Sequence, residues 1–444
     1  MAPEPFRRLF LLDPGWIVVK VLAQLQTVRT GVDFAGFQAG VVVDMNRQIR
    51  LWWMLAVALA VVPGVGAQTE QTLYNFTGAW DGGDPLSSLV MDASGNLYGT
   101  TFVGGAHGAG EVFELSPNTS GGWTESVLYT FTSGADGANP YYADVIFDEA
   151  GNLYGTTVEG GAHNLGVVFE LTPTGNGWSE SVLYSFTGGN DGANPYSGLL
   201  FDPAGNLYGT TYGGGANSDG TVFQLKHSHD QWTEQVIHTF DFTTGAFPVG
   251  GLVFDRRGDL FGTTQGGGAS GAGVVFGLQR FKGNTWTGRV LHNFSGGTDG
   301  SFPYAERLIF DQAGSLYGTT EGGGINNYGV VFRLSPTIHG WKEQVLYEFT
   351  GVVEANPYSG LVMDGSGNLY GTCANGNGVT TVGSVFELTP LAGGNYTETD
   401  LHLFTRTDGE FPEAALLLDK AGNLYGTTLL GGAGNTGVVF EMSK

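Results

Sequence analysis

From Gln68 onward, apolar and polar residues alternate in short runs that are separated by turn-forming residues. One unit contains four such runs: DVIFD (144–148), NLYGTT (152–157), GVVFEL (166–171) and SESVLYSF (179–186). Alternation with a period of two over four to eight residues, bounded by Gly, Asn and Pro, is typical of β-strands. No stretch has helical apolar spacing long enough for a βαβ unit. The pattern therefore predicts an all-β chain in which each unit forms a four-stranded antiparallel sheet.

This unit recurs seven times along the chain. The aromatic residue of the GNLYGTT motif lies at Tyr98, Tyr154, Tyr208, Phe261, Tyr317, Tyr370 and Tyr425, with successive spacings of 53 to 56 residues. Two further motifs, similar to VVFEL and VLYTF, also occur seven times. Four strands in about 54 residues match one blade of a β-propeller, whereas a β-helix coil needs about half that length.

The repeats begin and end out of phase with the unit. The first run, TEQTLYNF (69–76), aligns with TESVLYTF (124–131), which is the fourth run of a unit, and the last run, GVVFEM (437–442), is a third run. The last unit therefore lacks its outer strand, and the N-terminus supplies one. Pairing the two would close a ring and remove an exposed sheet edge. We predict a seven-bladed β-propeller over residues 68–444, with an N-terminal strand completing the last blade.

The repeated motifs GNLYGTT, GGGxN, GVVFEL and GWxExVLYxF resemble those of the GloVer-type extracellular tandem-repeat proteins of bacteria, also described as choice-of-anchor proteins. The resemblance covers residues 69–444. It implies export and no particular activity. The chain departs from the family pattern at Lys444, which follows the last strand without a sorting motif, hydrophobic tail or anchor domain, so we expect release and not surface attachment.

Residues 45–67 have the pattern of a signal peptide. Arg47 and Arg50 precede an apolar run, Leu51–Val62, and the small residues Val65 and Ala67 follow it. Twelve apolar residues are too few to span a bilayer comfortably, although an uncleaved anchor is the alternative. We expect translation from Met45, a mis-annotated leader at 1–44, and a secreted or periplasmic protein with no membrane span after cleavage.

Charge and composition exclude several classes of function. The chain has 18 Lys and Arg against 42 Asp and Glu; without residues 1–67, which hold six basic and four acidic residues, the balance is 12 against 38, or −26 over 377 residues. This charge repels phosphate backbones, so we expect no nucleic-acid partner. No GxxxxGK[ST], HExxH or GxSxG motif occurs, and we expect a monomer without cofactor, metal or catalytic residues. The single cysteine, Cys373, is expected to be a buried, inert thiol.

Three sets of repeated side chains are predicted to be structural. An aspartate such as Asp148 ends the first strand of every unit and is expected to cap the turn; a calcium site would need 6–8 oxygen ligands. The tryptophan heading the fourth strand, for example Trp178, is expected to wedge between blades, with sugar stacking as the alternative. Histidines replace tyrosines at His238, His292 and His402, which argues against a metal site.

Strand alternation places the loops between second and third strands on the same rim as the blade-to-blade loops. The repeats differ most on this rim, which is where a rigid scaffold usually carries recognition. We therefore predict a secreted, non-catalytic module that binds a glycan, a protein or a small ligand there. The alternative is an extracellular polysaccharide lyase or hydrolase whose acid and base come from Glu159, Glu321 and His163. The candidate ligand-binding residues are Glu159, Glu321, His107, His163, Tyr212, Tyr328, Asp136, Asp191, Asp299 and Asp408.

Overall fold

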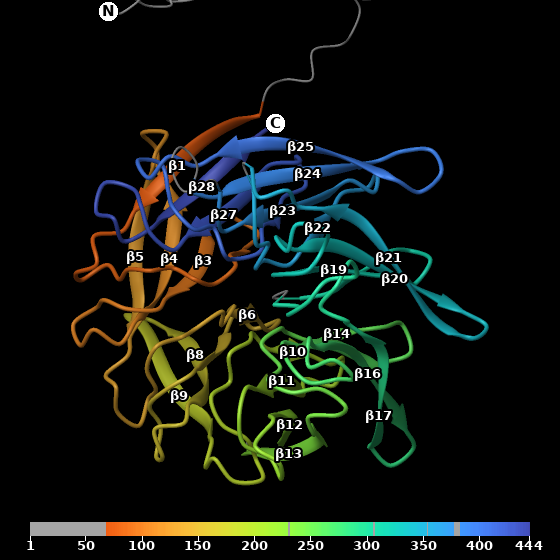
Figure 1. Ribbon diagram of the computed structural model, residues 1–444. Coiled ribbons are helices and arrows are strands. Elements are labelled where there is room, and N and C mark those ends of the chain that lie inside the picture. The colour runs from red at the N-terminus through yellow and green to blue at the C-terminus, as the bar shows by residue number, and fades with distance from the viewer. Residues whose placement is uncertain (1–67, 230, 305–306, 353, 377–381) are drawn as a thin grey trace, which may run out of the picture. The chain divides into compact units, whose positions relative to one another are not determined.

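The computed structural model describes residues 68–444 except 230, 305–306, 353 and 377–381. These residues form seven four-stranded antiparallel sheets arranged around a central axis (Figure 1). The prediction of an all-β, seven-bladed propeller is confirmed. The predicted leader and signal peptide lie outside the described residues.

The strands are numbered along the chain, and blades 1 to 6 each take four consecutive strands from β2 to β25, with the innermost strand first. Blade 7 consists of β26, β27, β28 and β1. The bounds are β1 Thr69–Asn75; β2 Val90–Met91, β3 Leu97–Thr101, β4 Glu111–Pro117, β5 Trp123–Thr130; β6 Ile146–Phe147, β7 Leu153–Thr157, β8 Val167–Thr174, β9 Gly177–Ser185; β10 Leu200–Phe201, β11 Leu207–Thr211, β12 Thr221–Ser228, β13 Gln231–Thr239; β14 Val253–Phe254, β15 Leu260–Thr264, β16 Val274–Phe281, β17 Thr285–Asn293; β18 Ile309–Phe310, β19 Leu316–Thr320, β20 Val330–Thr337, β21 Gly340–Glu348; β22 Val362–Met363, β23 Leu369–Cys373, β24 Ser384–Pro390, β25 Tyr396–Leu403; β26 Leu417–Leu418, β27 Leu424–Thr428 and β28 Val438–Ser443.

The ring is closed by the first strand. β1 pairs antiparallel with β28, from Thr69 opposite Ser443 to Asn75 opposite Val438, and the two lie side by side in Figure 1, orange beside dark blue. Just beyond the strand, the Phe76 amide donates to the Gly437 carbonyl at 3.1 Å. The predicted closure is confirmed. The pairing with β1 satisfies the backbone N–H and C=O groups of β28, which would otherwise form an exposed sheet edge.

Adjacent blades are joined by a repeated aromatic contact. Phe131, at the end of the outer strand of blade 1, meets Phe169 of blade 2 edge to face, with ring centroids 5.2 Å apart. The equivalent pair occurs at all seven blade junctions at 5.0 to 5.2 Å. The glycine of the GTT motif makes room for it, because a Cβ on Gly155 would lie 2.6 Å from the Phe169 ring. The motif glycine is therefore required by packing.

In six of the seven blades, the middle threonine of the same motif donates a hydrogen bond from the second strand to the next blade; the equivalent hydroxyl in blade 4, that of Thr263, has no such partner among the described residues. The Thr156 hydroxyl of blade 2 donates to the Ser197 carbonyl of blade 3 at 3.0 Å. At the closing junction, Thr427 of blade 7 donates to the Ser87 carbonyl of blade 1 at 3.2 Å. These buried bonds satisfy backbone carbonyls next to the central channel.

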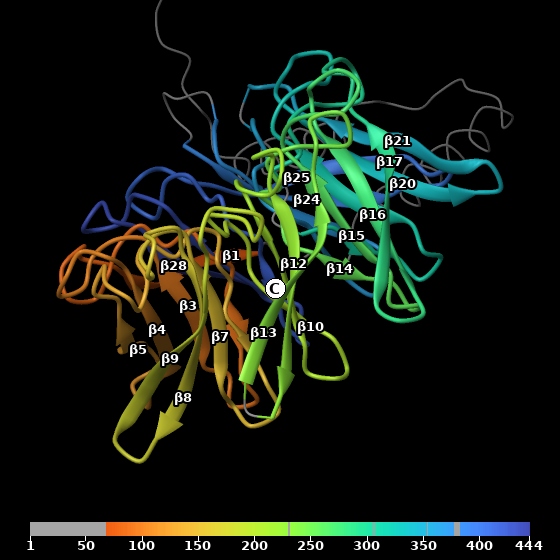
Figure 2. The ribbon, with the colours of Figure 1, turned by 90° about the horizontal axis from the view of Figure 1, so that it is seen from below.

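The ring has two rims of different character. On what we call the turn rim lie the turns between first and second strands and the hairpins between third and fourth strands, such as β8–β9 (Figure 2). The loop rim carries the other connections, and there each blade-to-blade loop bridges to a second-to-third loop, as at Ala138 and Glu159. The predicted arrangement of loops is confirmed.

The predicted structural roles are also confirmed. Asp148 accepts the backbone N–H groups of Ala150 and Asn152 at 2.9 and 2.8 Å, as a turn cap does. Trp232 of blade 3 contacts Tyr154 of blade 2 with ring centroids 6.2 Å apart. Cys373 is fully buried, and its burial raises the pKa of its thiol.

Candidate functional site at the mouth of the central channel

Seven side chains that follow the blade prolines surround the channel at the loop rim. The residue before each proline has a positive φ, between 52° and 60° in the seven blades, which turns the chain into the innermost strand. Asn139 fixes one such turn, because its side-chain amide donates to the Phe102 carbonyl at 2.9 Å. The seven residues after the prolines are Leu86, Tyr141, Tyr196, Val249, Tyr304, Tyr358 and Glu413.

The tyrosines of this set form two aromatic groups. Tyr141 and Tyr196, from blades 2 and 3, have ring centroids 5.0 Å apart, and Tyr304 and Tyr358, from blades 5 and 6, are 5.1 Å apart. Tyr212 extends the first group, with its centroid 4.7 Å from that of Tyr196. All five rings are half-buried, so each exposes part of its surface.

Blade 2 has an extra residue, and a buried tyrosine of this blade contacts both groups. The turn aspartate lies eight residues after the proline in blades 2 and 5, and seven residues after it in the other five blades. The extra length in blade 2 accommodates Tyr142, which is buried and contacts Tyr304 of blade 5 at 5.8 Å. Its hydroxyl donates to Glu413 of blade 7 at 2.6 Å. Burial raises the pKa of both Tyr142 and Glu413, and the nearby charge of Glu321 raises the pKa of Glu413 further.

An ion pair crosses the channel next to this aromatic layer. The Asp144 carboxylate of blade 2 lies 3.5 Å from the Arg307 guanidinium of blade 5 and also accepts the Ser88 amide at 2.9 Å. The other blades have Ser, Gly or Ala at this position. A cavity of about 500 Å³ adjoins the pair, walled mainly by apolar residues of the inner strands of blades 1, 2, 5, 6 and 7. We name Tyr141, Tyr142, Tyr196, Tyr212, Tyr304, Tyr358, Glu321 and Glu413 the mouth cluster.

The structure brings two of the predicted candidates into the mouth cluster. Glu321, on the β19–β20 loop, accepts a hydrogen bond from the Tyr358 hydroxyl at 2.8 Å. Tyr212 also stacks on Phe247 with centroids 5.1 Å apart. Glu159 is exposed on the β7–β8 loop, where its charge contributes to the raised pKa of Tyr196.

The remaining candidates lie elsewhere on the loop rim. His107, His163 and Tyr328 are exposed on loops. The four aspartates take part in the blade-to-blade turns: Asp136 and Asp191 accept tyrosine hydroxyls at 3.0 Å, while Asp299 and Asp408 lie 3.4 and 3.0 Å from histidine nitrogens. These bonds give the aspartates a structural role, and ligand binding by them stays a prediction.

Most of the mouth cluster was missed from the sequence. The signals that could have found it are the extra residue of blades 2 and 5 and the tyrosine after the blade proline in four repeats. The missed residues are Tyr141, Tyr142, Tyr196, Tyr304, Tyr358 and Glu413, together with the ion pair Asp144 and Arg307.

Two groups among the described residues bring metal-ligating atoms within 4.8 Å of one another: Glu70, His402 and Asp408, and Glu354, Glu398 and Asp400. In the first group, the hydrogen bond from His402 contributes to a pKa of about 2 for Asp408. In the second group, burial raises the pKa of all three carboxyls. Raised pKa values favour the protonated carboxyls, and neighbouring carboxyls of this kind titrate as a coupled group.

Comparison with known protein families identifies the repeats. The model of the Gloeobacter/Verrucomicrobia repeat matches four overlapping stretches, residues 62–180, 118–307, 174–382 and 278–444. The chain belongs to the Gloeobacter/Verrucomicrobia repeat family. The resemblance drawn from the repeated motifs is thereby confirmed, and the propeller described above is the fold of this family member. No curated protein matches the chain.

Solved structures share the fold of this repeat protein at low sequence identity. They include PorZ, a bacterial surface component of the type-IX secretion system of Porphyromonas gingivalis (TM-score 0.50, 15% identity, 81% of this chain and 46% of that one). The extracellular domain of a putative one-component system of B. thetaiotaomicron has a TM-score of 0.50 at 10% identity and covers 84% and 40%. An ancestral GH74 enzyme has a TM-score of 0.50 at 13% identity and covers 82% and 51%.

The repeat protein thus spans between 40% and 51% of the length of these three structures. Two of them are surface or extracellular proteins by description. Among the residues that the structure describes, none forms a helix with the length and hydrophobicity needed to cross a bilayer.

Proposed function

We propose that this family member is a secreted recognition module that binds a neutral saccharide at the mouth cluster. The observation that carries the proposal is the asymmetry of the mouth, where half-exposed tyrosine rings from four blades stand beside the carboxylates of Glu321 and Glu413. A ligand that lacks sevenfold symmetry needs a site formed by residues that differ from one blade to the next.

The chemistry of the mouth cluster suits a sugar. Tyrosine rings offer flat apolar faces for the C–H faces of a pyranose, and their hydroxyls both donate and accept hydrogen bonds. The carboxylates accept hydrogen bonds from sugar hydroxyls. A neutral ligand is favoured because the described chain is strongly acidic and would repel an anion at a site that holds two carboxylates.

A thermal-shift screen of neutral oligosaccharides on the purified protein tests the proposal. A ligand at 100 times its Kd stabilises the folded state by about 2.7 kcal/mol, which raises the melting temperature measurably. Tyr196→Val and Tyr304→Leu copy residues that sister blades have at the same position, Val249 and Leu86. Each variant should fold and weaken binding at least about tenfold, which corresponds to 1.4 kcal/mol.

Glu149→Gln, an exposed change on the turn rim, is the matched control and should bind as the unmodified protein does. Unchanged affinity in both tyrosine variants would place the ligand elsewhere. Tighter binding of a quaternary amine than of any sugar would show that the mouth selects cations.

A polysaccharide hydrolase is the second candidate, and the Glu321–Glu413 pair favours it. The raised pKa of Glu413 beside a second carboxylate is the arrangement that supplies a general acid and a general base. The Tyr142 hydroxyl occupies one oxygen of Glu413, however, and this favours binding over turnover. Release of new reducing ends from a bound oligosaccharide, abolished by Glu413→Gln, would establish the enzyme.

A further inference from the structure

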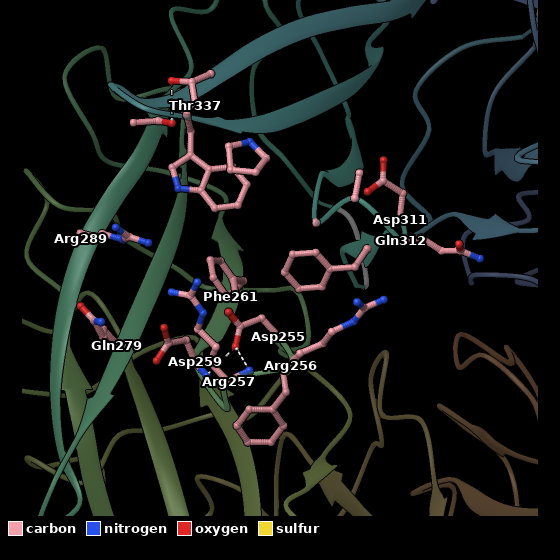
Figure 3. Close-up of a pocket in the computed structure, with 17 residues that line it drawn as sticks. Asp255, Arg256, Arg257, Asp259, Phe261, Gln279, Arg289, Asp311, Gln312 and Thr337 are labelled. Atoms are coloured by element: carbon pink, nitrogen blue, oxygen red, sulfur yellow. Dashed lines mark hydrogen bonds between the residues drawn. The ribbon is translucent and has the colours of Figure 1, made fainter.

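A second pocket lies on the turn rim between blades 4 and 5. It has a volume of about 600 Å³ and is lined by the β14–β15 turn, β17, the β18–β19 turn and the β20–β21 hairpin (Figure 3). Phe261 and Trp341, which line it, meet edge to face with centroids 5.9 Å apart. Three arginines also line the pocket: Arg256 and Arg257 from the β14–β15 turn and Arg289 from β17.

Blade 4 has a charge opposite to that of the rest of the chain. Residues 253–293 contain five basic residues, Arg256, Arg257, Arg280, Lys282 and Arg289, against two acidic ones, which gives +3. Residues 68–444 contain only 12 basic residues against 38 acidic ones. Five of the twelve cations therefore lie in one blade, and three of these five line the pocket.

The three pocket arginines have no carboxylate partner within the part of the chain that the structure describes. The fourth arginine of the blade, Arg280, lies 3.9 Å from Asp202 and 5.6 Å from the Trp286 ring. No ion pair or side-chain hydrogen bond involves the guanidinium groups of Arg256, Arg257 or Arg289 among those residues. Each guanidinium therefore keeps its donors for a ligand.

The aspartates that line the same pocket are bonded to backbone amides. Asp255 accepts the N–H groups of Arg257 and Asp259 at 2.8 and 2.9 Å. Asp259 accepts the Arg280 amide at 2.9 Å, and Asp311 accepts the Ser315 amide at 2.8 Å. These carboxylates stabilise the local turns, and their negative charge is partly balanced by the amide dipoles.

The fold does not require arginine at any of the three positions. In blade 1 the two turn positions are Ala93 and Ser94, and the strand position is Ser126. The blade 1 turn forms the same amide bond, from Ser94 to Asp92 at 2.8 Å. The arginines are thus an addition to a turn and strand that fold equally well without them.

We propose that this pocket binds the carboxylate of an acidic saccharide, a uronic acid unit of an extracellular glycan. The planar guanidinium group matches a carboxylate with two parallel hydrogen bonds. The partly exposed ring of Trp341, which packs on the buried Phe261, offers a flat surface to the sugar ring. The inference is independent of the proposed function, because it concerns the opposite rim and an anionic ligand.

Trigalacturonate is the probe, and its methyl ester is the matched control that removes only the charges. By calorimetric titration at low salt, the acid should bind at least tenfold more tightly than the ester, and added NaCl should weaken it. The triple variant Arg256→Ala, Arg257→Ser and Arg289→Ser copies the blade 1 residues and should lose at least tenfold in affinity. Arg289→Ser alone, on an exposed strand position, should show a smaller loss and serves if the triple variant folds poorly.

Lys226→Ser, Lys420→Ala and Lys444→Ser together remove the same charge elsewhere and should leave binding unchanged. Equal binding of acid and ester, or retained affinity in both arginine variants, would overturn the proposal. Inorganic sulfate that competes as strongly as the trisaccharide would also overturn it, since the pocket would then recognise only a small anion. Neutral-saccharide binding at the mouth cluster should be the same in the arginine variants, so the two proposals fail separately.

Discussion

Replacing Glu180 by glutamine tests a source of pH-dependent stability that the repeat builds into the blade junctions. The outer strands of five blades carry a glutamate two residues after the heading aromatic, and in each of them one carboxylate oxygen is buried without a hydrogen-bond partner in the described structure. Burial and, to a smaller extent, the charge of Asp136 on the neighbouring blade-to-blade loop raise the pKa of Glu180 to about 7. The five residues are Glu125, Glu180, Glu234, Glu343 and Glu398.

The sign of the effect follows from the direction of these shifts. A carboxyl whose pKa is higher in the folded than in the unfolded state stabilises the fold below its unfolded pKa, about 4.3. This stability is lost as the pH rises through the folded value, about 7. One pKa unit equals 1.36 kcal/mol, so the shift of Glu180 sets an upper limit of about 3 kcal/mol, which solvent screening of a half-buried group reduces to about 1 kcal/mol.

Other groups titrate with the opposite sign, so a variant is more informative than a pH scan alone. Burial lowers the pKa of His238 and His292, and the stability they contribute is lost as the pH falls through about 6.5. Hydrogen bonds lower the pKa of Asp136 and Asp191, whose contribution is lost only below about pH 4. Glu180→Gln removes one of the five glutamate contributions and leaves the others in place.

Urea unfolding of the Glu180→Gln protein should therefore differ from that of the unmodified protein mainly at high pH. At pH 8 we expect the variant to be more stable by about 1 kcal/mol, because glutamine resembles the neutral acid that the site prefers. At pH 3.5, which lies below the unfolded pKa, the two should agree within about 0.3 kcal/mol. The control variant Glu149→Gln, which changes an exposed turn residue, should match the unmodified protein in stability at both pH values. Equal or lower stability of Glu180→Gln at pH 8 would refute the reasoning.

Three further predictions concern closure, the turns and processing. Deleting residues 68–77 removes β1 and leaves β28 unpaired, so we expect aggregation or a loss of several kcal/mol by urea unfolding; unchanged unfolding would contradict the role of β1. Asp148→Ala removes two backbone amide bonds and should lower the free energy of unfolding by at least about 1 kcal/mol while leaving ligand binding at the mouth intact. N-terminal sequencing of exported protein should begin at Gln68, and retention of residues 1–44 would contradict both the cleavage site and the start at Met45.

The fold could be predicted because it rests on positions that occur seven times. Every blade carries a turn aspartate and a GTT motif, which is GTC in blade 6, so the number of blades and their order follow from counting. Closure followed from the phase of the first and last runs. The role of the GTT glycine, which makes room for Phe169, and of the threonine, which bonds the next blade, became clear only from contacts between blades.

For the candidate site, the sequence could predict only the rim on which it lies, and not most of the residues that form it. Local patterns show which loops share a face, but they do not show that Tyr142 reaches Glu413, 271 residues later in the chain. The aspartates of the blade-to-blade loops were predicted to bind a ligand because they lie on the rim where the repeats differ most. A local signal was available in their case: Tyr129 precedes Asp136 by seven residues, and Tyr184 precedes Asp191 by seven, which is the spacing of the observed hydrogen bonds.

The asymmetry of the mouth has a simple geometric origin. Seven equal blades would surround the axis with seven equal side chains, and like charges at one level of the channel would repel one another. Blades 2 and 5 are three positions apart in the ring, so residues from them can meet across the axis. The Asp144–Arg307 pair forms between these two blades, the two in which the inner segment is one residue longer.

The same two blades also provide the contact between Tyr142 and Tyr304. A buried charge such as Asp144 is tolerated only with a partner, so the two blades depend on each other at this level. The repeated positions build a ring, and the contacts of Asp144 and Tyr142 with blades 5 and 7 make one level of its channel chemically distinct.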